Sequence, residues 1–365
     1  MATNTRIGAA VPSVERSVQR STGAGGSGAE VEPPLVAYVL PVLDEAEGIV
    51  AFHRELIDAT RSRPDLSFEF VYVDDGSTDS SLAELIGLRA DDDRVTVVSL
   101  SRNHGHQIAL TAGLDLCAHA DAVIVMDTDL QDPPAVSLRM LVAWEAGADV
   151  VYAQRRTRQD TWFKRSSATS FYWLLDRVSE VDIPCHVGDF RLLDRRVVAE
   201  VARYREHDRF LRGIVAQVGF RQEAILYDRA ARTSGTSSYP IRSMLRLAAS
   251  GLLGFSTTPL RLISRTGMAI SLVSVALAAY VFGVRVFDPD QAVPGWAFLG
   301  VGMFLLGGLQ LVMMGVIGSY LGRVYVEAQD RPLYAVASCA RGRVDRRDTD
   351  RTAADALTHQ PRGGR

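Results

Sequence analysis

Residues 122–134 read AVIVMDTDLQDPP, an apolar run followed directly by acidic residues and a pair of prolines. A short apolar run with such boundaries is typical of a buried β-strand that ends near the first aspartate. Asp127, Asp129 and Gln131 then place oxygen-bearing side chains on one short loop. Mg²⁺ and Mn²⁺ prefer such oxygens. Acidic turns are common on protein surfaces, so the position after a strand is what favours a metal site here.

Similar apolar runs lie on both sides of this stretch, and we expect them to form further strands. They occupy residues 35–40, 68–73, 95–100 and 149–153. Helix-like stretches separate the strands at residues 46–61, 79–90, 105–119 and 134–146. This alternation predicts an α/β fold with a mainly parallel sheet and flanking helices on both faces. Ligands bind such sheets beyond the carboxyl ends of the strands.

Acidic residues also follow the first two predicted strands. The first strand leads into Pro41-Val-Leu-Asp-Glu45, and the second into Val73-Asp-Asp-Gly-Ser-Thr-Asp79. Helix capping and a tight turn explain the glycine and serine of the second segment. They explain less well why two carboxylates adjoin the strand end, where an acid can accept hydrogen bonds from a base or a ribose. The phosphate-loop and dinucleotide-binding glycine motifs do not follow any of these strands, which disfavours both classes of protein.

Composition excludes some classes of protein. The chain has 365 residues, a formal net charge of −3 and three cysteines. Nucleic-acid binders normally carry a basic excess, so nucleic acid is not an expected partner. Cys117, Cys185 and Cys339 lack the spacing of metal or disulfide frameworks, which indicates a reducing environment.

Two long stretches without charge lie near the C-terminus. They cover 19 residues at 266–284 and 32 residues at 291–322. Because about 20 apolar helical residues cross a bilayer, we expect a two-helix transmembrane hairpin with helices at 266–287 and 293–322. A pair of buried core helices is the alternative. Arginines without acidic residues precede the first stretch, and the segment between the two stretches carries two aspartates, so the α/β domain and both termini are expected in the cytosol.

The remaining segments complete the predicted organisation. Residues 1–33 are rich in Gly and Ser and are expected to be disordered. The α/β domain is expected over residues 34–240. It is followed at 241–265 by a stretch expected to form amphipathic juxtamembrane helices that lie in the membrane interface, and an amphipathic segment packed on the α/β domain is the alternative. The tail at 323–365 is expected to be cytosolic and largely disordered.

Five motifs in order carry a resemblance to a known family. PVLDEAEGI, VDDGSTDSS, SRNHGHQIALTAGLDL, VIVMDTDLQDPP and GDFRLLDRR begin at residues 41, 73, 101, 123 and 188. Together they resemble the inverting family-2 glycosyltransferases of GT-A fold, and among these the polyprenyl-phosphate hexosyltransferases. That branch includes bactoprenol glucosyltransferases and, more distantly, dolichol-phosphate mannose synthases. The resemblance implies transfer of a hexose, foremost glucose from UDP-glucose, to polyprenyl (undecaprenyl) phosphate with inversion. It also implies a Mg²⁺ or Mn²⁺ cofactor and a cell-membrane (inner-membrane) location.

The resemblance also implies roles for individual residues. Asp129 and Asp189 would be catalytic, and the metal would be held by Asp127, Asp129 and Gln131. The nucleotide sugar would contact Pro41, Leu43, Glu45, Val73, Asp75, Asp127, Thr128, Asp129, Gln131, Arg155 and Arg232.

The chain departs from the family pattern at two positions. Ser238 stands where the motif near the membrane has a lysine, which removes a positive charge expected near the phosphates. His104 stands where an aromatic residue is expected before Gly105. The spacing of His104 and His106 could suit a metal, but polar packing at the start of a helix is the favoured interpretation.

Other functions are open on the sequence. A polyprenyl-phosphate mannose synthase using GDP-mannose is one alternative. A non-catalytic membrane scaffold or flippase partner with a degenerate transferase domain is another. A processive polysaccharide synthase is disfavoured because none of the four tryptophans lies in a [QR]-x-x-R-W motif. The expected partners are the sugar donor, the lipid phosphate, membrane lipid and a second copy of the chain in a homo-oligomer.

Overall fold

A computed structural model describes residues 32–156, 187–228 and 296–342, together with part of 260–280. The strands are β1 (Leu35–Val42), β2 (Ser67–Asp74), β3 (Val95–Leu100), β4 (Ala122–Val125), β5 (Val150–Arg155), β6 (Val187–Asp194), β7 (Gln222–Tyr227) and β8 (Val336–Ala340). The helices are α1 (Ile49–Thr60), α2 (Ser81–Asp91), α3 (His106–Leu116), α4 (Ala135–Glu145), α6 (Arg195–Val201), α7 (Leu211–Val218) and α10 (Trp296–Ala328).

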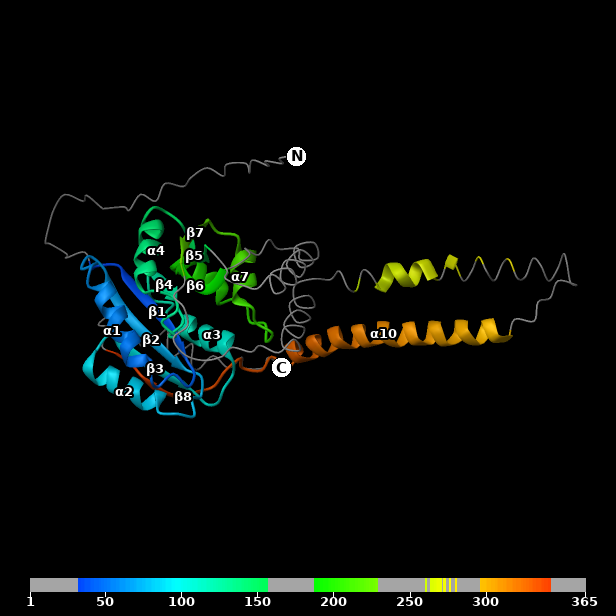
Figure 1. The fold of residues 1–365 in the computed structure, drawn as a ribbon, viewed down its shortest axis with the longest axis horizontal. Helices are drawn as coiled ribbons and strands as arrows, with labels where there is room; N and C mark the ends of the chain where they lie inside the picture. Colours follow the sequence, from blue (N-terminus) through cyan, green and yellow to red (C-terminus); the bar gives the residue numbers. More distant parts are fainter. Residues whose placement is uncertain are drawn as a thin grey trace, which may run out of the picture.

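All eight strands form one sheet, in the order β7-β5-β6-β4-β1-β2-β3-β8. β1 pairs in parallel with β2 and β4, β2 with β3, and β5 with β7. β6 runs antiparallel between β4 and β5, and β8 runs antiparallel along β3. The carboxyl ends of β4, β1 and β2 therefore lie side by side at one edge of the sheet (Figure 1).

Helices cover both faces of the sheet because successive side chains of a strand point to opposite faces. Along β1, Tyr38 and Leu40 pack into one hydrophobic cluster with α1, α2 and α4. Val39 packs into a second cluster, which includes residues of α3, α6 and α7. All eight residues of β1 are buried, as expected for a central strand covered on both faces.

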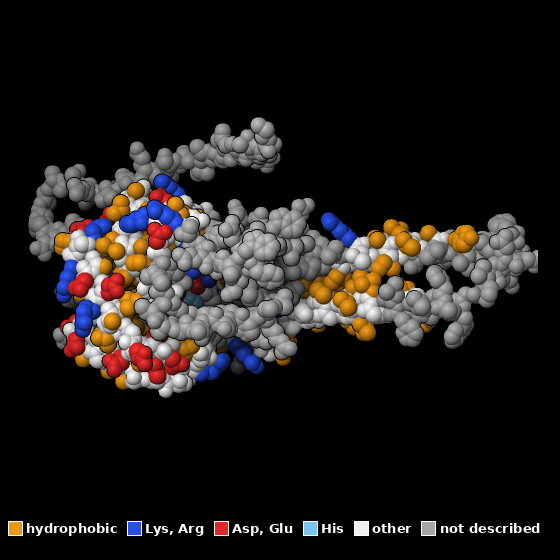
Figure 2. Space-filling model, in the orientation of Figure 1, with side chains coloured by type: hydrophobic (Ala, Val, Ile, Leu, Met, Phe, Trp, Pro, Cys, Tyr) orange, Lys and Arg blue, Asp and Glu red, His pale blue; other side chains and the backbone are white. Residues whose placement is uncertain are grey.

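α10 is a 33-residue helix that extends away from the sheet (Figure 1). Its segment Leu306–Ala328 is long and apolar enough to cross a membrane, and none of it is buried within the protein. Hydrophobic side chains gather along this extension, whereas acidic and basic side chains are interspersed over the sheet domain (Figure 2). The chain then turns back, and β8 adds to the free edge of β3.

The mainly parallel α/β fold with flanking helices is confirmed, and the predicted strands and helices of residues 35–153 all form within a few residues of their expected ends. The tail prediction was wrong in part. α10 continues to Ala328, and β8 is an ordered strand within 323–365, because the β3 edge supplies backbone partners that the tail alone lacks.

Several predicted segments lie wholly or mostly outside the described residues. They are the N-terminal segment at 1–33, the juxtamembrane helices at 241–265 and much of the first membrane helix at 266–287. Within that first helix, the described residues 266–270 are helical. The two-helix hairpin therefore stays a prediction.

Candidate active site

The predicted nucleotide pocket lies at the carboxyl ends of β1, β2 and β4. Pro41 of β1 pairs in register with Val73 of β2, and both are buried. The Thr128 Oγ1 hydroxyl, just beyond β4, donates to the Pro41 carbonyl over 3.3 Å. Leu43 follows β1 and is 42% exposed, so it is open to a ligand at this edge. The structure thus brings together four residues that the sequence assigned to one pocket.

Two adjacent acids at the end of β2 hold the neighbouring loops. Asp74 accepts from the Ser77 backbone N–H at 3.0 Å and from the Ser99 hydroxyl at 2.9 Å. Asp75 accepts from the backbone N–H groups of His104 and Gly105, at 2.8 and 2.9 Å. Asp75, a predicted nucleotide ligand, therefore fixes the turn before α3.

The segments after β1 and β4 hold strained backbone. Asp44 and Leu130 have φ angles of 54° and 55°, in a region that residues other than glycine rarely adopt. The Asp44 carboxylate compensates by accepting from the Thr78 backbone N–H over 2.7 Å. Such strain often accompanies functional loops, and Leu130 lies between Asp129 and Gln131.

The loop after β4 concentrates negative charge. Burial raises the pKa of Asp127 to about 6; the charge of His106 opposes this rise, and the carboxylates of Asp189, Asp132 and Asp129 add to it. Carboxylate oxygens gathered on one loop are a donor set that suits a divalent cation. Within the part of the chain that the structure describes, no group of three or more His, Cys, Asp or Glu side chains is arranged to hold a metal.

Asp129 and Gln131 complete the predicted metal set. The Asp129 Oδ1 atom accepts from the Gln131 backbone N–H at 3.1 Å, which orders the loop. The Gln131 residue itself is 7% exposed. Two carboxylates and one amide oxygen thus lie on a single ordered turn.

Asp189 lies on β6, close to Asp127. The β4–β6 ladder pairs Val125 with Arg191, so extending its register by two residues sets Asp127 opposite Asp189. The His106 Nε2 atom joins these acids, at 3.2 Å from the Asp189 Oδ2 atom and 3.7 Å from the Asp127 Oδ1 atom. Two carboxylates that are 62 positions apart in the sequence therefore lie beside the same histidine ring.

Several donors hold the Asp189 carboxylate. Gln107 Nε2 donates to its Oδ2 atom over 3.1 Å, and Arg212 Nε donates to its Oδ1 atom over 2.9 Å. Burial raises the pKa of Asp189, but the His106 hydrogen bond and the charges of Arg212 and Arg191 outweigh it and hold that pKa well below its usual range. Asp189 is therefore an anion at neutral pH and is poorly suited to remove a proton.

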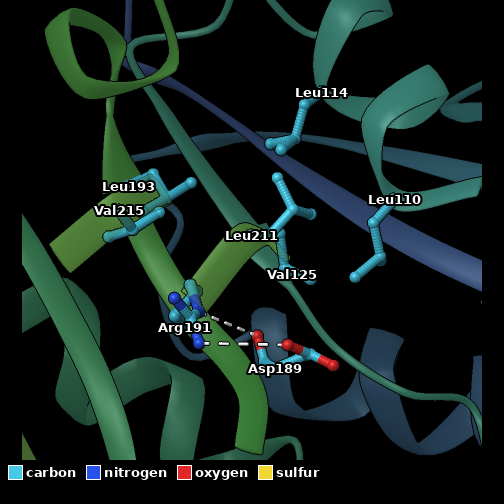
Figure 3. Close-up of a pocket in the computed structure, with 8 residues that line it drawn as sticks. All are labelled: Leu110, Leu114, Val125, Asp189, Arg191, Leu193, Leu211 and Val215. Atoms are coloured by element: carbon cyan, nitrogen blue, oxygen red, sulfur yellow. Dashed lines mark hydrogen bonds and ion pairs between the residues drawn. The ribbon is translucent and has the colours of Figure 1, made fainter. Parts of the chain in front are cut away.

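On its other side, Asp189 lies next to aliphatic side chains of the hydrophobic core. Figure 3 shows Asp189 and Arg191 at the edge of a small hollow that is otherwise lined by aliphatic side chains. Arg191 is 5% exposed and donates to the Gly188 carbonyl at 2.9 Å. Burial lowers the pKa of Arg191 to about 10, which still leaves it positive at pH 7. Its charge is felt strongly by Asp189 because the surroundings are apolar.

Arg155, a predicted ligand of the sugar nucleotide, lies at the end of β5. Its Nε atom donates to the Tyr227 hydroxyl oxygen over 3.3 Å, and that hydroxyl donates to Asp132. The structure therefore links Arg155 to the loop that carries Asp127 and Asp129. Glu45 lies half-buried after β1, where its backbone N–H donates to Ser81 over 2.8 Å.

Some residues named from the sequence lie outside the described part of the chain, and three other residues join the site. Arg232 and Ser238 lie outside the described residues. His106 was interpreted as polar packing at a helix start, yet it also contacts both Asp127 and Asp189. The sequence predicted no role for Gln107 or Arg212, although Gln107 lies in the motif that begins at residue 101. Arg212 lies outside all five motifs and carries no comparable signal.

Comparisons with known proteins identify the family of the chain. Residues 38–202 match the family model described as glycosyl transferase family 2. The Bacillus subtilis (strain 168) protein named uncharacterized glycosyltransferase YkcC is 43% identical over 304 residues, which cover 82% of this chain and 92% of that protein. The bactoprenol glucosyl transferase of Shigella phage SfII is 37% identical over 84% of this chain and 99% of its own length.

Among solved structures, the mannosyltransferase PcManGT from Pyrobaculum calidifontis, in complex with GDP-Man and Mn²⁺, is 17% identical with a TM-score of 0.39. That alignment covers 82% of this chain and 88% of the mannosyltransferase. The family assignment rests on the closer sequence relatives and on the family model. By these matches, the chain belongs to glycosyltransferase family 2, and its sequence relatives include bactoprenol glucosyltransferases.

Proposed function

We propose that this glycosyltransferase moves a hexose, namely glucose from UDP-glucose, to undecaprenyl phosphate with inversion at the anomeric carbon. The observation that carries the proposal is the pair Asp127 and Asp189, which His106 bridges at the carboxyl edge of the sheet. The likeness to the SfII bactoprenol glucosyl transferase extends over 99% of that protein, which supports a lipid phosphate as the acceptor.

A divalent cation, Mg²⁺ or Mn²⁺, fits the charge of the loop after β4. Asp127 and Asp129 would hold it, with Gln131 as a further oxygen ligand. When bound, such a cation neutralises the diphosphate leaving group. The chain's own contribution is to keep these carboxylates on one ordered turn, which the Gln131 N–H to Asp129 bond supports. Arg155 would add a charge-assisted hydrogen bond to the donor.

Asp189 would act by its charge. The acceptor is a phosphate monoester whose second pKa is about 6, by analogy with phosphorylated side chains, so it is already largely a dianion at neutral pH. A strong general base is therefore not required. The permanent negative charge of Asp189 would orient the sugar and stabilise positive character at its anomeric carbon. A single displacement by the acceptor oxygen then inverts that carbon, and an α-linked donor gives a β-linked product.

The membrane arrangement is part of the proposal. β7 and β8 belong to one sheet, so the chain leaves the domain after Tyr227 and re-enters it at Val336 on the same side of a membrane. If Leu306–Ala328 crosses once, a second crossing must precede it, which supports the hairpin of residues 266–287 and 293–322. We place the catalytic domain and both termini in the cytosol and the hairpin in the inner membrane. Lipid and a second copy of the chain would contact α10.

The proposal is tested with full-length protein in detergent. The protein is incubated with Mn²⁺ or Mg²⁺, undecaprenyl phosphate and either UDP-glucose or GDP-mannose, and lipid products are identified by mass spectrometry. The expected result is a metal-dependent hexosyl phospholipid from UDP-glucose. Formation of product from GDP-mannose but not from UDP-glucose would refute the donor assignment. The absence of product from folded protein with both donors would refute the proposal and favour a scaffold role.

A further inference from the structure

The loop that leads into α7 lies between the end of the membrane helix and the sugar site. Residues 205–212, called here the connector, start after α6 and include the first two residues of α7. One side of the connector contacts α10 and the residues that follow it, and the other side contacts α3 and β6. It is a short path along the chain between these two regions.

On the membrane side, the connector makes several polar contacts with the end of α10. The His207 backbone N–H donates to Glu327 over 2.8 Å, and the His207 ring Nδ1 lies 3.1 Å from the other Glu327 oxygen. The ring Nε2 lies 2.9 Å from the Arg331 carbonyl oxygen. Asp208 pairs with Arg323 at 2.7 Å. These contacts hold α10 at two positions, Arg323 and Glu327, about one turn apart, so they oppose rotation and tilting of the helix relative to the sheet domain.

A third contact ties the connector to α3 and to the approach of β8. Asp115, near the end of α3, accepts from Arg205 and from the Tyr334 hydroxyl, both at 2.8 Å. The Asp115 side chain is 7% exposed and that of Arg205 is 51% exposed, so the carboxylate at the centre of this three-way junction is shielded while the arginine reaches solvent. α3 is also the helix whose first residues, His106 and Gln107, hold Asp189.

On the catalytic side, the connector ends on the sugar site itself. The Leu211 backbone N–H donates to the Gln107 side-chain oxygen over 2.9 Å. The next residue, Arg212, donates to Asp189 over 2.9 Å. Five positions of chain therefore separate the contact with Glu327 from the contact with Asp189.

We propose that the connector fixes the angle between α10 and the sheet, so that the sugar site faces a phosphate carried at the membrane surface. His207, Asp208 and Glu327 are then positioning residues for a lipid acceptor. The inference rests on the proposed function. In the described part of the chain, the covalent link from α10 to the sheet is the stretch 329–335, which leads to β8 at the far edge, and a link of this kind does not by itself set the angle of a helix. Arg323 is the first charged residue of α10, so the contacts lie where the helix leaves the hydrocarbon layer.

The acceptor's chain length provides the test. A polyprenyl phosphate in a bilayer holds its phosphate at a fixed height, whereas a ten-carbon isoprenoid phosphate below its aggregation limit diffuses to the site in any orientation. Full-length protein in liposomes is assayed with UDP-glucose and each acceptor. The Asp208→Asn, Glu327→Gln double variant removes two charges, because single exposed ion pairs contribute little.

We expect the double variant to lose at least fivefold in kcat/KM for undecaprenyl phosphate and to stay within twofold for the short acceptor. Asp58→Asn, which breaks an exposed aspartate–arginine pair on α1 that also spans 2.7 Å, should change neither value. Restoring the ion pair in reversed order, with Asp208→Arg and Arg323→Asp in a protein that also carries Glu327→Gln, should recover at least half of the activity that the double variant loses.

Other outcomes overturn the proposal. An equal loss with both acceptors means that the connector serves only to stabilise the site. No loss with either acceptor means that it does not set the angle. Product from neither acceptor with the unaltered, folded protein refutes the proposed function, and the inference falls with it.

Discussion

Replacing Asp189 with asparagine tests the central electrostatic claim about the site. The change keeps the shape of the side chain but removes a charge that Arg212 and His106 contact directly and that Arg191 faces at 3.9 Å. An asparagine NH₂ group would also point toward donors. Removing one partner of a buried ion pair costs about 3–5 kcal/mol, and we expect the lower end because Arg212 is 34% exposed.

The effect on catalysis follows from the same charge. Loss of one pre-organised electrostatic contact to a developing charge costs about 3 kcal/mol, which corresponds to a roughly 100-fold slower reaction. The assay measures kcat and kcat/KM for transfer from UDP-glucose, with the melting temperature recorded alongside. We expect kcat to fall about 100-fold while the protein stays folded at the assay temperature.

A matched control separates stability from chemistry. Asp149 is also a buried carboxylate paired with an arginine, Arg196 at 2.5 Å, but it lies at the start of β5, away from the acidic loop. Asp149→Asn should lower the melting temperature and leave kcat within twofold. If Asp189→Asn kept kcat within threefold while Asp129→Asn abolished turnover, the charge role given to Asp189 would be wrong.

Three further predictions concern the metal, a turn and a buried histidine. Asp129→Asn should reduce transfer at least 100-fold and remove the rise in melting temperature that Mn²⁺ and UDP together give the unaltered protein; an unchanged rise would exclude Asp129 as a ligand. Gly76→Ala should lower the unfolding free energy by more than about 2 kcal/mol, because the φ angle of Gly76 is 74° and a Cβ atom would lie 2.6 Å from the Arg102 backbone. As a control, Gly87→Ala should raise the unfolding free energy by about 0.5–1 kcal/mol, because Gly87 lies in α2 with open space around it. Denaturant titrations measure both values. Burial, only partly opposed by the charge of a nearby acid, lowers the pKa of His53. The unfolded chain therefore binds a proton more readily than the folded chain, and the unfolding free energy should fall as the pH drops below about 6.5. His53→Phe should reduce this dependence of the unfolding free energy on pH in unfolding curves recorded between about pH 5 and 8.

The sheet from β1 to β5 could be predicted because its strands are continuous apolar runs between helical patterns, and hydrophobic periodicity is a local property. The carboxyl-edge site followed from the same reasoning, since parallel strands bring their ends together. β8 could not be predicted this way. Its sequence, VASCA, has no alternating pattern, and it becomes a strand because β3 offers an unpaired edge.

The contacts of Asp189 could not be predicted from the sequence for a related reason. His106, Gln107 and Arg212 reach it from helices that lie 83, 82 and 23 positions away along the chain. Spacing rules work within one element and do not report which elements meet. The family resemblance pointed to Asp189 itself, but only the antiparallel ladder between β4 and β6 sets it opposite Asp127.

The position of β8 also bears on how the protein matures. β3 pairs with a strand that the ribosome makes some 240 positions later, Val98 with Cys339, so the β3 edge of the sheet stays unpaired until the residues that follow α10 have been made. An open border with free N–H and C=O groups is prone to join other chains. The closing strand becomes available only after α10 has been made and, in the membrane arrangement proposed above, after the chain has returned to the side of the sheet domain. Completion of the sheet would thus follow correct insertion, and chains that insert wrongly would expose a feature that quality-control proteases and chaperones can engage.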